Sequence, residues 1–465
     1  MLRFFANRWW FSCSAVLVAV ISGGAVALGE RASTEQPRGS ESIDGRYVLR
    51  APGLDGWNAR QQGPKNNPGE ARRFGSAFQY DAFVYDKVAK SPSVTGVVRR
   101  GSVLSVGNKV SGPGCKDGTW YQAVPFGYVC TSLGFHVADT PSTNRYGVPP
   151  AKLDQHLPYQ YSRVITERAP RYYRIPTVSE EAQARDAMEK KGPIPEAVST
   201  MMEGDFFLAL AEKETREADG AVFYRTVRGR YLRETDVELR NPDVVRGEEL
   251  GRDGWRLPVA FVYGEDRPLL SLEDATPRTT GKAEKHARFV VEDELTKGGV
   301  AYVSGKPGAI RRDEVRVARR AKRPSDVPAG AKWIHVDLSE QTLVAYEGDA
   351  PVYATVISSG KEGYEPPTGL FQVEQKYVST TMNATDPIDG FYEVEEVPWT
   401  LYYYGGYALH GAYWHTDFGK VRSHGCTNVA PVDARWLYYW SDPEVPKAWH
   451  AVRFPSETTW VYFTS

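Results

Sequence analysis

The sequence predicts a mainly β, multidomain protein in which small antiparallel barrels precede a β-rich C-terminal domain with one short helix. Three observations support this fold class. The chain has 465 residues, which is enough for three or four domains that each bury a core. Aromatic residues make up 12% of it, including 27 Tyr and 12 Trp, and such side chains favour strands. Its 43 Gly and 31 Pro indicate many turns and at least one long linker.

The charge balance limits the kinds of partner. The 57 basic residues are matched by 58 acidic ones, so the chain has no global field that would attract nucleic acid or an acidic partner. We therefore expect no nucleic-acid partner.

Residues 1–28 are predicted to export the chain. Arg3 and Arg8 precede an apolar run, Trp9–Leu28, of about twenty residues, which is long enough to span a bilayer. Ala25-Val26-Ala27 also suits signal cleavage, so a cleaved signal peptide and a retained membrane anchor are both open. Either one exports the remainder. We expect a periplasmic or cell-envelope protein that meets the membrane only through this segment.

Export changes the interpretation of the cysteines. Cys115 and Cys130 lie fifteen residues apart, and a disulfide between them is predicted in an oxidising compartment; the alternative is two free buried thiols. Cys426 then remains unpaired, and a leftover thiol in an exported protein is a candidate for reactivity.

Residues 29–77 are polar and rich in Gly, Pro, Gln, Asn and Arg, which predicts a disordered spacer. Residues 78–137 contain short runs typical of strands, separated by turn residues, and predict a small barrel: Ala82–Tyr85, Ser102–Val106, Trp120–Val124 and Gly127–Cys130. This stretch resembles bacterial SH3-like domains, which often accompany cell-wall enzymes.

Residues 138–203 predict a linker with one helix, because Thr177-Val178-Ser179-Glu180 forms a capping box before good helix formers. Residues 204–323 are again strand-like. A pattern of glycine, aliphatic strand, polar link and second aliphatic occurs three times, at Gly127–Leu133, Gly229–Val237 and Gly308–Val315. It indicates two more SH3-like or related barrels between residues 204 and 320, with chance similarity of short amphipathic strands as the alternative.

Residues 332–465 predict the β-rich C-terminal domain. Alternation of Ile334, Val336 and Leu338 is typical of strands in a two-layer architecture. The stretch Glu362–Tyr404 is expected to form a hairpin or flap with an aromatic lining, or else ordinary core. Pro431 suits the first turn of a helix that runs to Trp440.

The stretch Leu409–Val429, LHGAYWHTDFGKVRSHGCTNV, combines the residue types of a thiol enzyme. A thiolate at Cys426 needs an imidazole to take its proton and amide donors to hold the oxyanion. His410 and Gly425 are candidates for those two functions. Two alternatives remain: Cys426 is a small buried hydrophobe, or a metal site uses ligand types whose spacing matches no tight zinc pattern, namely His410, His415, His424 and Cys426.

These residues resemble the catalytic motif of the L,D-transpeptidases, the YkuD-like family. His410 is followed, after twelve residues, by Ser423-His424-Gly425-Cys426-Thr427-Asn428. The interval is somewhat shorter than in many members. Upstream segments also resemble the family's opening strands: Trp333–Leu338, Gln341–Leu343, Ser358–Gly360 and Pro367–Phe371. The resemblance covers roughly residues 332–463, under a third of the chain, and implies a mainly β transpeptidase fold.

The resemblance also implies a mechanism that needs no cofactor and no metal. Cys426 is the expected nucleophile, His410 the proton donor and acceptor, Gly411 the residue whose carbonyl orients His410, and Gly425 an oxyanion amide. Residues expected to shape the substrate site are Ser423, His424, Asn428 and, from the flap, Tyr404.

The implied substrates are peptidoglycan stem peptides. A tetrapeptide donor would acylate Cys426, and a diaminopimelate amine would then accept the acyl group and form a cross-link. The same chemistry with water as acceptor gives a carboxypeptidase or endopeptidase, and a wall-binding scaffold with an idle thiol is the alternative from another class. β-Lactams of the carbapenem type are expected covalent inhibitors.

Overall fold

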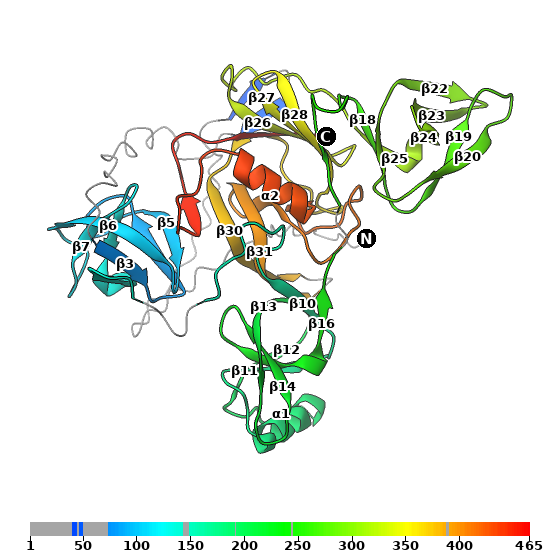
Figure 1. Ribbon diagram of the computed structural model, residues 1–465. Coiled ribbons are helices and arrows are strands. Elements are labelled where there is room, and N and C mark those ends of the chain that lie inside the picture. Colours follow the sequence, from blue (N-terminus) through cyan, green and yellow to red (C-terminus); the bar gives the residue numbers. More distant parts are fainter. Residues whose placement is uncertain are drawn as a thin grey trace, which may run out of the picture.

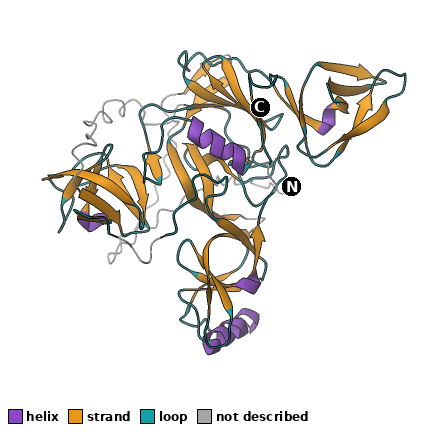
Figure 2. Cartoon of the chain, viewed as in Figure 1, coloured by secondary structure: helices purple, strands orange, loops and turns teal. Residues whose placement is uncertain are grey.

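The computed structural model describes residues 40–43, 46–49, 73–142, 148–190, 192–242, 245–386 and 390–465, and it confirms the mainly β, multidomain fold class. The α-helices among these residues are α1 (Val178–Lys190) and α2 (Pro431–Trp440). Figure 2 shows that strands dominate every part of the fold. The export segment predicted at residues 1–28 lies outside the described residues. Within them, no helix is both long and apolar enough to cross a bilayer.

Residues 73–138 form a first β unit, which we call unit 1. Its strands are β3 (Arg73–Ala77), β4 (Asp81–Tyr85), β5 (Val94–Arg99), β6 (Val103–Val110), β7 (Trp120–Ala123), β8 (Tyr128–Cys130) and β9 (Phe135–Ala138). All pair antiparallel, with β3 between β6 and β9. The predicted disulfide between Cys115 and Cys130 is confirmed, with the two Cα atoms 5.7 Å apart.

The spacer expected at residues 29–77 contains strands where the structure describes it. β1 (Ser40–Ile43) and β2 (Arg46–Leu49) pair as an antiparallel hairpin, and β3 belongs to unit 1. The sequence of β3, RFGSA, has small and polar residues in place of an aliphatic run, so it gives little strand signal. The other residues of this range lie outside the described part.

Residues 160–240 form unit 2. Its strands are β10 (Gln160–Val164), β11 (Ala169–Tyr172), β12 (Val198–Met202), β13 (Asp205–Thr215), β14 (Val222–Thr226), β15 (Tyr231–Arg233) and β16 (Val237–Arg240). β10 pairs with both β13 and β16, so the range 160–202, expected as part of a linker, belongs to this sheet. The expected helix is α1. Its capping box is present, because the Glu180 N–H donates to Thr177 Oγ1 at 3.2 Å and the Thr177 N–H donates to the Glu180 carboxylate at 2.8 Å.

Residues 259–318 form unit 3, which projects from the body of the molecule at the right of Figure 1. Its strands are β18 (Val259–Val262), β19 (Arg267–Ser271), β20 (Arg278–Ala283), β21 (Arg288–Val290), β22 (Asp293–Lys297), β23 (Val300–Gly305), β24 (Gly308–Arg311) and β25 (Val315–Ala318). Its own core includes Val262, Phe289 and Ile310.

The pattern that occurs three times in the sequence has one structure. In each unit a strand, a single turn of 3-10 helix and a second strand follow one another. The three 3-10 turns are Thr131–Leu133, Glu234–Asp236 and Arg312–Glu314. The repeats therefore mark equivalent local structures in units 1, 2 and 3.

The C-terminal domain contains β26 (Lys332–Asp337), β27 (Thr342–Glu347), β28 (Ala350–Ser358), β29 (Gly369–Gln372), β30 (Gln375–Asp386), β31 (Gly390–Tyr404), β32 (Tyr407–Gly411), β33 (Thr427–Val429), β34 (Ala451–Arg453) and β35 (Trp460–Thr464). β17 (Glu248–Glu249) pairs with β28. The expected hairpin is β30–β31, and the expected helix is α2, which buries Ala434 and Leu437.

Unit 2 and the C-terminal domain share a continuous sheet, because β13 pairs in parallel with β31. The Tyr161 hydroxyl donates to the Glu396 carbonyl at 2.7 Å, and its ring stacks on Tyr413 with centroids 3.8 Å apart. Unit 1 joins the same domain through β5 and β34. A buried ion pair supports this second junction, with an Arg99 nitrogen 2.7 Å from a Glu396 oxygen.

Candidate active site

Parallel pairing of β32 and β33 brings the two halves of the motif together. His410 lies opposite Asn428 across this pair, and Cys426 immediately precedes β33. Neighbouring strands are about 4.8 Å apart, so the fold closes the interval between histidine and cysteine. Both residues are buried, His410 to 2% and Cys426 to 3% residual exposure, and Cys426 forms no disulfide with any described residue.

The turn before Cys426 is held by its own polar groups. The Ser423 hydroxyl donates to the Cys426 carbonyl, and the Gly425 N–H donates to Ser423 Oγ at 3.1 Å. Gly425 has a φ of +126°, which only glycine adopts without strain, and a Cβ there would lie 3.0 Å from the Tyr407 ring. The amide of Gly425 thus lies beside the nucleophile candidate, but it already has a partner within the turn.

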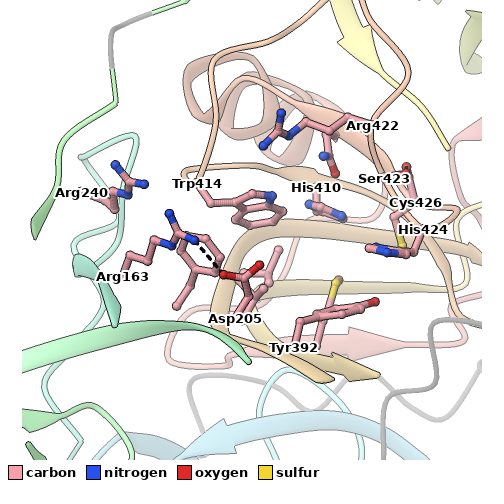
Figure 3. A pocket seen from close by; sticks show the side chains of 15 residues that line it. Arg163, Asp205, Arg240, Tyr392, His410, Trp414, Arg422, Ser423, His424 and Cys426 are labelled. Carbon is pink, nitrogen blue, oxygen red and sulfur yellow. Dashed lines mark hydrogen bonds and ion pairs between the residues drawn. The ribbon is translucent and has the colours of Figure 1, made fainter. Parts of the chain in front are cut away.

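A cavity of about 430 Å³ opens onto this turn (Figure 3). The C-terminal domain contributes most of its lining: Met382, Tyr392, Val394, Val397, His410, Trp414, Arg422, Ser423, His424, Cys426 and Asn428. Unit 2 contributes the rest: Arg163, Asp205, Phe207 and Arg240. The cavity therefore contains both predicted reactive residues and is bounded by two parts of the chain that are distant in sequence.

The imidazole of His410 is neutral at pH 7. Burial lowers its pKa to about 4, and the Gly411 backbone opposes this shift only in part. Nδ1 makes no hydrogen bond of ordinary geometry within the described residues. A neutral, buried imidazole can accept a proton from the thiol, and the adjacent Gly411 carbonyl would favour the imidazolium that results.

His415, to which the family resemblance assigns no role, positions Asn428. The Asp417 N–H donates to His415 Nδ1 at 3.1 Å, and burial, aided by the charge of Arg422, lowers the pKa of His415 to about 3. The neutral ring therefore has its hydrogen on Nε2, which lies 2.8 Å from Asn428 Nδ2. Two donors cannot bond to each other, so the consistent amide orientation presents Oδ1 to His415 and turns the NH₂ group away.

His424 is clamped between aromatic rings. It stacks on Tyr392 at 5.0 Å and meets the edge of Tyr364 at 5.3 Å, and the Lys361 ammonium lies 3.4 Å from its Nε2. His424 and His415 thus point to separate partners. Among the described residues, no group of three or more His, Cys, Asp or Glu side chains converges as a metal site.

The aromatic residues at the end of the predicted flap do not line the cavity. Trp399 and Tyr403 are fully buried in the hydrophobic core, and the Trp399 indole donates to the His156 carbonyl at 2.7 Å. Tyr404 packs against Phe371 and Tyr407 and does not line the cavity. A run of large aromatic side chains gives the same signal for a core strand as for a lining.

The aromatic residues that do line the cavity come from other positions. Tyr392 lies earlier in β31, Trp414 lies inside the motif stretch, and Phe207 comes from unit 2. The ring of Trp414 is 5.6 Å from that of His410. Trp414 lies in the sequence AYWHTDFG between His410 and Cys426, and this position inside the motif could have indicated that it lines the cavity. Nothing in the sequence around Phe207 indicates that it does.

The C-terminal domain matches a known family. Residues 331–450 match the family described as the YkuD L,D-transpeptidase catalytic domain. Among curated proteins no match to the chain is found.

Several solved structures are also similar to the chain. An Enterococcus faecium L,D-transpeptidase variant is 24% identical over 32% of this chain and 55% of its own, with a TM-score of 0.24. The E. faecium catalytic domain acylated by ertapenem is 25% identical over 28% of this chain and 99% of its own, with a TM-score of 0.22. A Mycobacterium smegmatis L,D-transpeptidase is 15% identical over 55% of this chain and 100% of its own, with a TM-score of 0.24.

The chain spans about half the length of the first of these structures. The match of residues 331–450 to the family, and not these superpositions, identifies the C-terminal domain.

Proposed function

With residues 331–450 identified as an L,D-transpeptidase catalytic domain, we propose that the protein cross-links peptidoglycan through a thioester at Cys426. The observation on which this rests is the convergence of Cys426 and His410 in one cavity of about 430 Å³. The donor is a stem tetrapeptide, and the acceptor is a diaminopimelate amine.

The first half of the reaction acylates the thiol. His410 removes the thiol proton, the sulfur forms a bond with the donor carbonyl carbon, and a tetrahedral oxyanion results. Collapse breaks the carbon–nitrogen bond, and the imidazolium returns its proton to the departing D-alanine amine. Because His410 is neutral before this step, it starts in the protonation state that a general base needs.

The second half transfers the acyl group. The acceptor amine attacks the thioester carbon, His410 takes the amine proton, and the carbon–sulfur bond breaks as the thiol is regenerated. The oxyanion in both halves needs amide donors, each worth roughly 3 kcal/mol. The Gly425 amide is the candidate, and binding of the substrate would then have to replace its hydrogen bond to Ser423.

Transfer to an amine competes with hydrolysis. Water is present at about 55 M, so an amine acceptor outcompetes it only if the thioester is shielded from water and the amine is held in position. Positioned reactants reach effective molarities of roughly 10⁵ M or more. Tyr392, Val394 and Trp414 supply apolar walls from the C-terminal domain, and unit 2 supplies the opposite wall. These walls support a transferase over the alternative carboxypeptidase or endopeptidase.

Two further expectations follow from the proposed reaction. A carbapenem should acylate Cys426, as ertapenem acylates the E. faecium catalytic domain. The substrate lies outside the cytoplasm, so we place the protein in the cell envelope, with residues 1–28 directing export. The Cys115–Cys130 disulfide fits an oxidising compartment.

The test is a product ratio. Purified protein receives a tetrapeptide donor with and without a stem peptide that offers a diaminopimelate amine, and mass spectrometry follows cross-linked dimer against free tripeptide. We expect dimer to dominate at millimolar acceptor. Dominant tripeptide would make the protein a hydrolase, and absence of both products would favour the wall-binding scaffold.

A further inference from the structure

Unit 2 places three charged side chains at the end of the cavity away from the thiol. Arg163 is on β10, Asp205 on β13 and Arg240 on β16, and all three line the same cavity as Cys426. Figure 3 shows Arg163 and Arg240 at one end and Cys426 at the other. None of the three is explained by the acyl-transfer chemistry, which takes place at the opposite end.

The strand register brings these side chains to one face of the sheet. Arg163 lies opposite Phe207, which is two residues from Asp205. Arg240 lies opposite Tyr161, which is two residues from Arg163. Side chains two residues apart on a strand point to the same face, so the cluster follows from the sheet and does not depend on a loop.

The cluster has an excess of positive charge. An Arg163 nitrogen lies 2.9 Å from an Asp205 oxygen, so these two largely neutralise each other. Arg240 is left with Glu238 at 3.4 Å, and that carboxylate is 57% exposed, where water and salt screen the attraction. The buried Nε of Arg240 has no hydrogen-bond partner among the described residues. The Arg240 side chain is 30% exposed and lines the cavity, so its guanidinium is available to an anionic ligand.

We propose that unit 2 builds an anion-recognition subsite, in which Arg240 binds a free carboxylate of the peptide donor away from the reacting bond. This inference rests on the proposed function, because the donor must lie in the cavity for Cys426 to reach its carbonyl. The body of the peptide then extends along the lining toward unit 2. A guanidinium matches a carboxylate with two parallel hydrogen bonds, which gives both attraction and orientation.

The Arg163–Asp205 pair sets the strength of this subsite. With Arg163 in place, the Asp205 charge is compensated and a donor carboxylate can approach Arg240. Removal of Arg163 alone would leave Asp205 to repel the donor, whereas removal of both charges would restore the balance. The pair thus makes a charge-specific prediction that a purely structural role of these residues would not make.

The experiment uses the full chain and two tetrapeptide donors that differ only in one free carboxylate, which is a carboxamide in the second. Acylation of Cys426 is followed by intact-protein mass spectrometry, and each rate is divided by the rate with ertapenem, which reports the state of the reactive centre. For Arg240→Gln we expect kcat/KM for the free-carboxylate donor to fall roughly 10- to 100-fold, with a much smaller loss for the carboxamide.

Two further variants complete the test. Arg163→Gln should penalise the free-carboxylate donor more than Arg163→Gln/Asp205→Asn does. Arg225→Gln, on β14 of the same unit and outside the cavity lining, is the matched control and should not discriminate between donors.

The possible outcomes separate the two proposals. Equal losses for the two donors, or no loss in Arg240→Gln, would overturn the subsite while acylation by ertapenem upholds the thiol chemistry. A wild-type protein that neither ertapenem nor a donor acylates would overturn the proposed function and the subsite together.

Discussion

Units 2 and 3 share the same strand, 3-10 turn and strand arrangement but meet the catalytic domain in different ways. Unit 2 joins its sheet through β13 and β31 and sends four side chains into the cavity. Within the described part of the chain, the strands of unit 3 pair only with one another, and unit 3 contacts the catalytic domain outside the cavity. Its β18 packs on the core of that domain, and Arg316 donates to the Gly419 carbonyl at 2.8 Å.

Units 2 and 3 share a local structure, so their different roles follow from where each one contacts the catalytic domain. Unit 2 forms a wall of the cavity in which substrate would lie. Unit 3 supports, from behind, the loop that connects His415 to Ser423. Lys285 adds to this support, with its ammonium 3.7 Å from the Asp417 carboxylate. Equal damage to the two units should therefore have unequal effects on acylation.

The largest contrast is expected from truncating one buried aromatic residue in each region. Tyr161→Ala removes a ring stacked on Tyr413 and a hydrogen bond to Glu396. Phe289→Ala leaves a cavity in the hydrophobic core of unit 3. Each should cost about 3–5 kcal/mol locally. Thermal unfolding should show both losses, but ertapenem acylation should collapse only in Tyr161→Ala. Equal acylation in the two variants would remove the distinction between the units.

A smaller effect is expected from the loop that unit 3 supports. Gly419 has a φ of +95°, and a Cβ there would lie 2.6 Å from Tyr263 Cβ, so Gly419→Ala must displace the loop. We expect acylation to slow about 10-fold, because strain of 1–3 kcal/mol is transmitted toward His415. Gly229→Ala, at a φ of +75° with open space around it, is the control in unit 2. It should cost only about 1 kcal/mol of stability and leave the acylation rate unchanged.

Acid should affect the reactive centre and spare the unit 2 wall, which contains no histidine. The general base must be neutral, and the pKa of His410 in the folded protein is about 4. Acylation should therefore stay constant as the pH falls from 8 to about 5 and be half lost near pH 4. A midpoint near 6.5, the usual value for an exposed histidine, would contradict a buried base. The reaction is quenched at several times at each pH, and mass spectrometry of the acylated protein gives the acylation rate as a function of pH.

Local signals in the sequence were sufficient for much of this structure. The capping box at Thr177 predicted α1, and Pro431 predicted the start of α2. The prediction that residues 1–28 export the chain led to the prediction of the Cys115–Cys130 disulfide. The motif that contains His410 and Cys426 predicted that these two residues act together, and the parallel pairing of β32 and β33 brings them together. In each case the relevant physical interaction lies within one short stretch or one motif.

Contacts between residues distant in the chain could not be predicted from the sequence. Arg163, Asp205 and Arg240 reach the cavity only because β13 pairs with β31, nearly two hundred positions later in the chain. No periodicity or spacing marks such a pairing in a single sequence. The strands of unit 2 before residue 203 were missed for a related reason, since Gln160–Val164 and Ala169–Tyr172 are short and contain Arg and Pro.

The most direct test of the whole account is the site of ertapenem attachment. Wild-type protein and Cys426→Ala are incubated with ertapenem, and intact-mass measurement is followed by peptide mapping. We expect one adduct on wild-type protein, located in the peptide that contains Cys426, and none on the variant, with equal thermal stability of the two proteins. An adduct on another residue, or an adduct that persists in Cys426→Ala, would contradict the assignment of Cys426 as the nucleophile of this cavity.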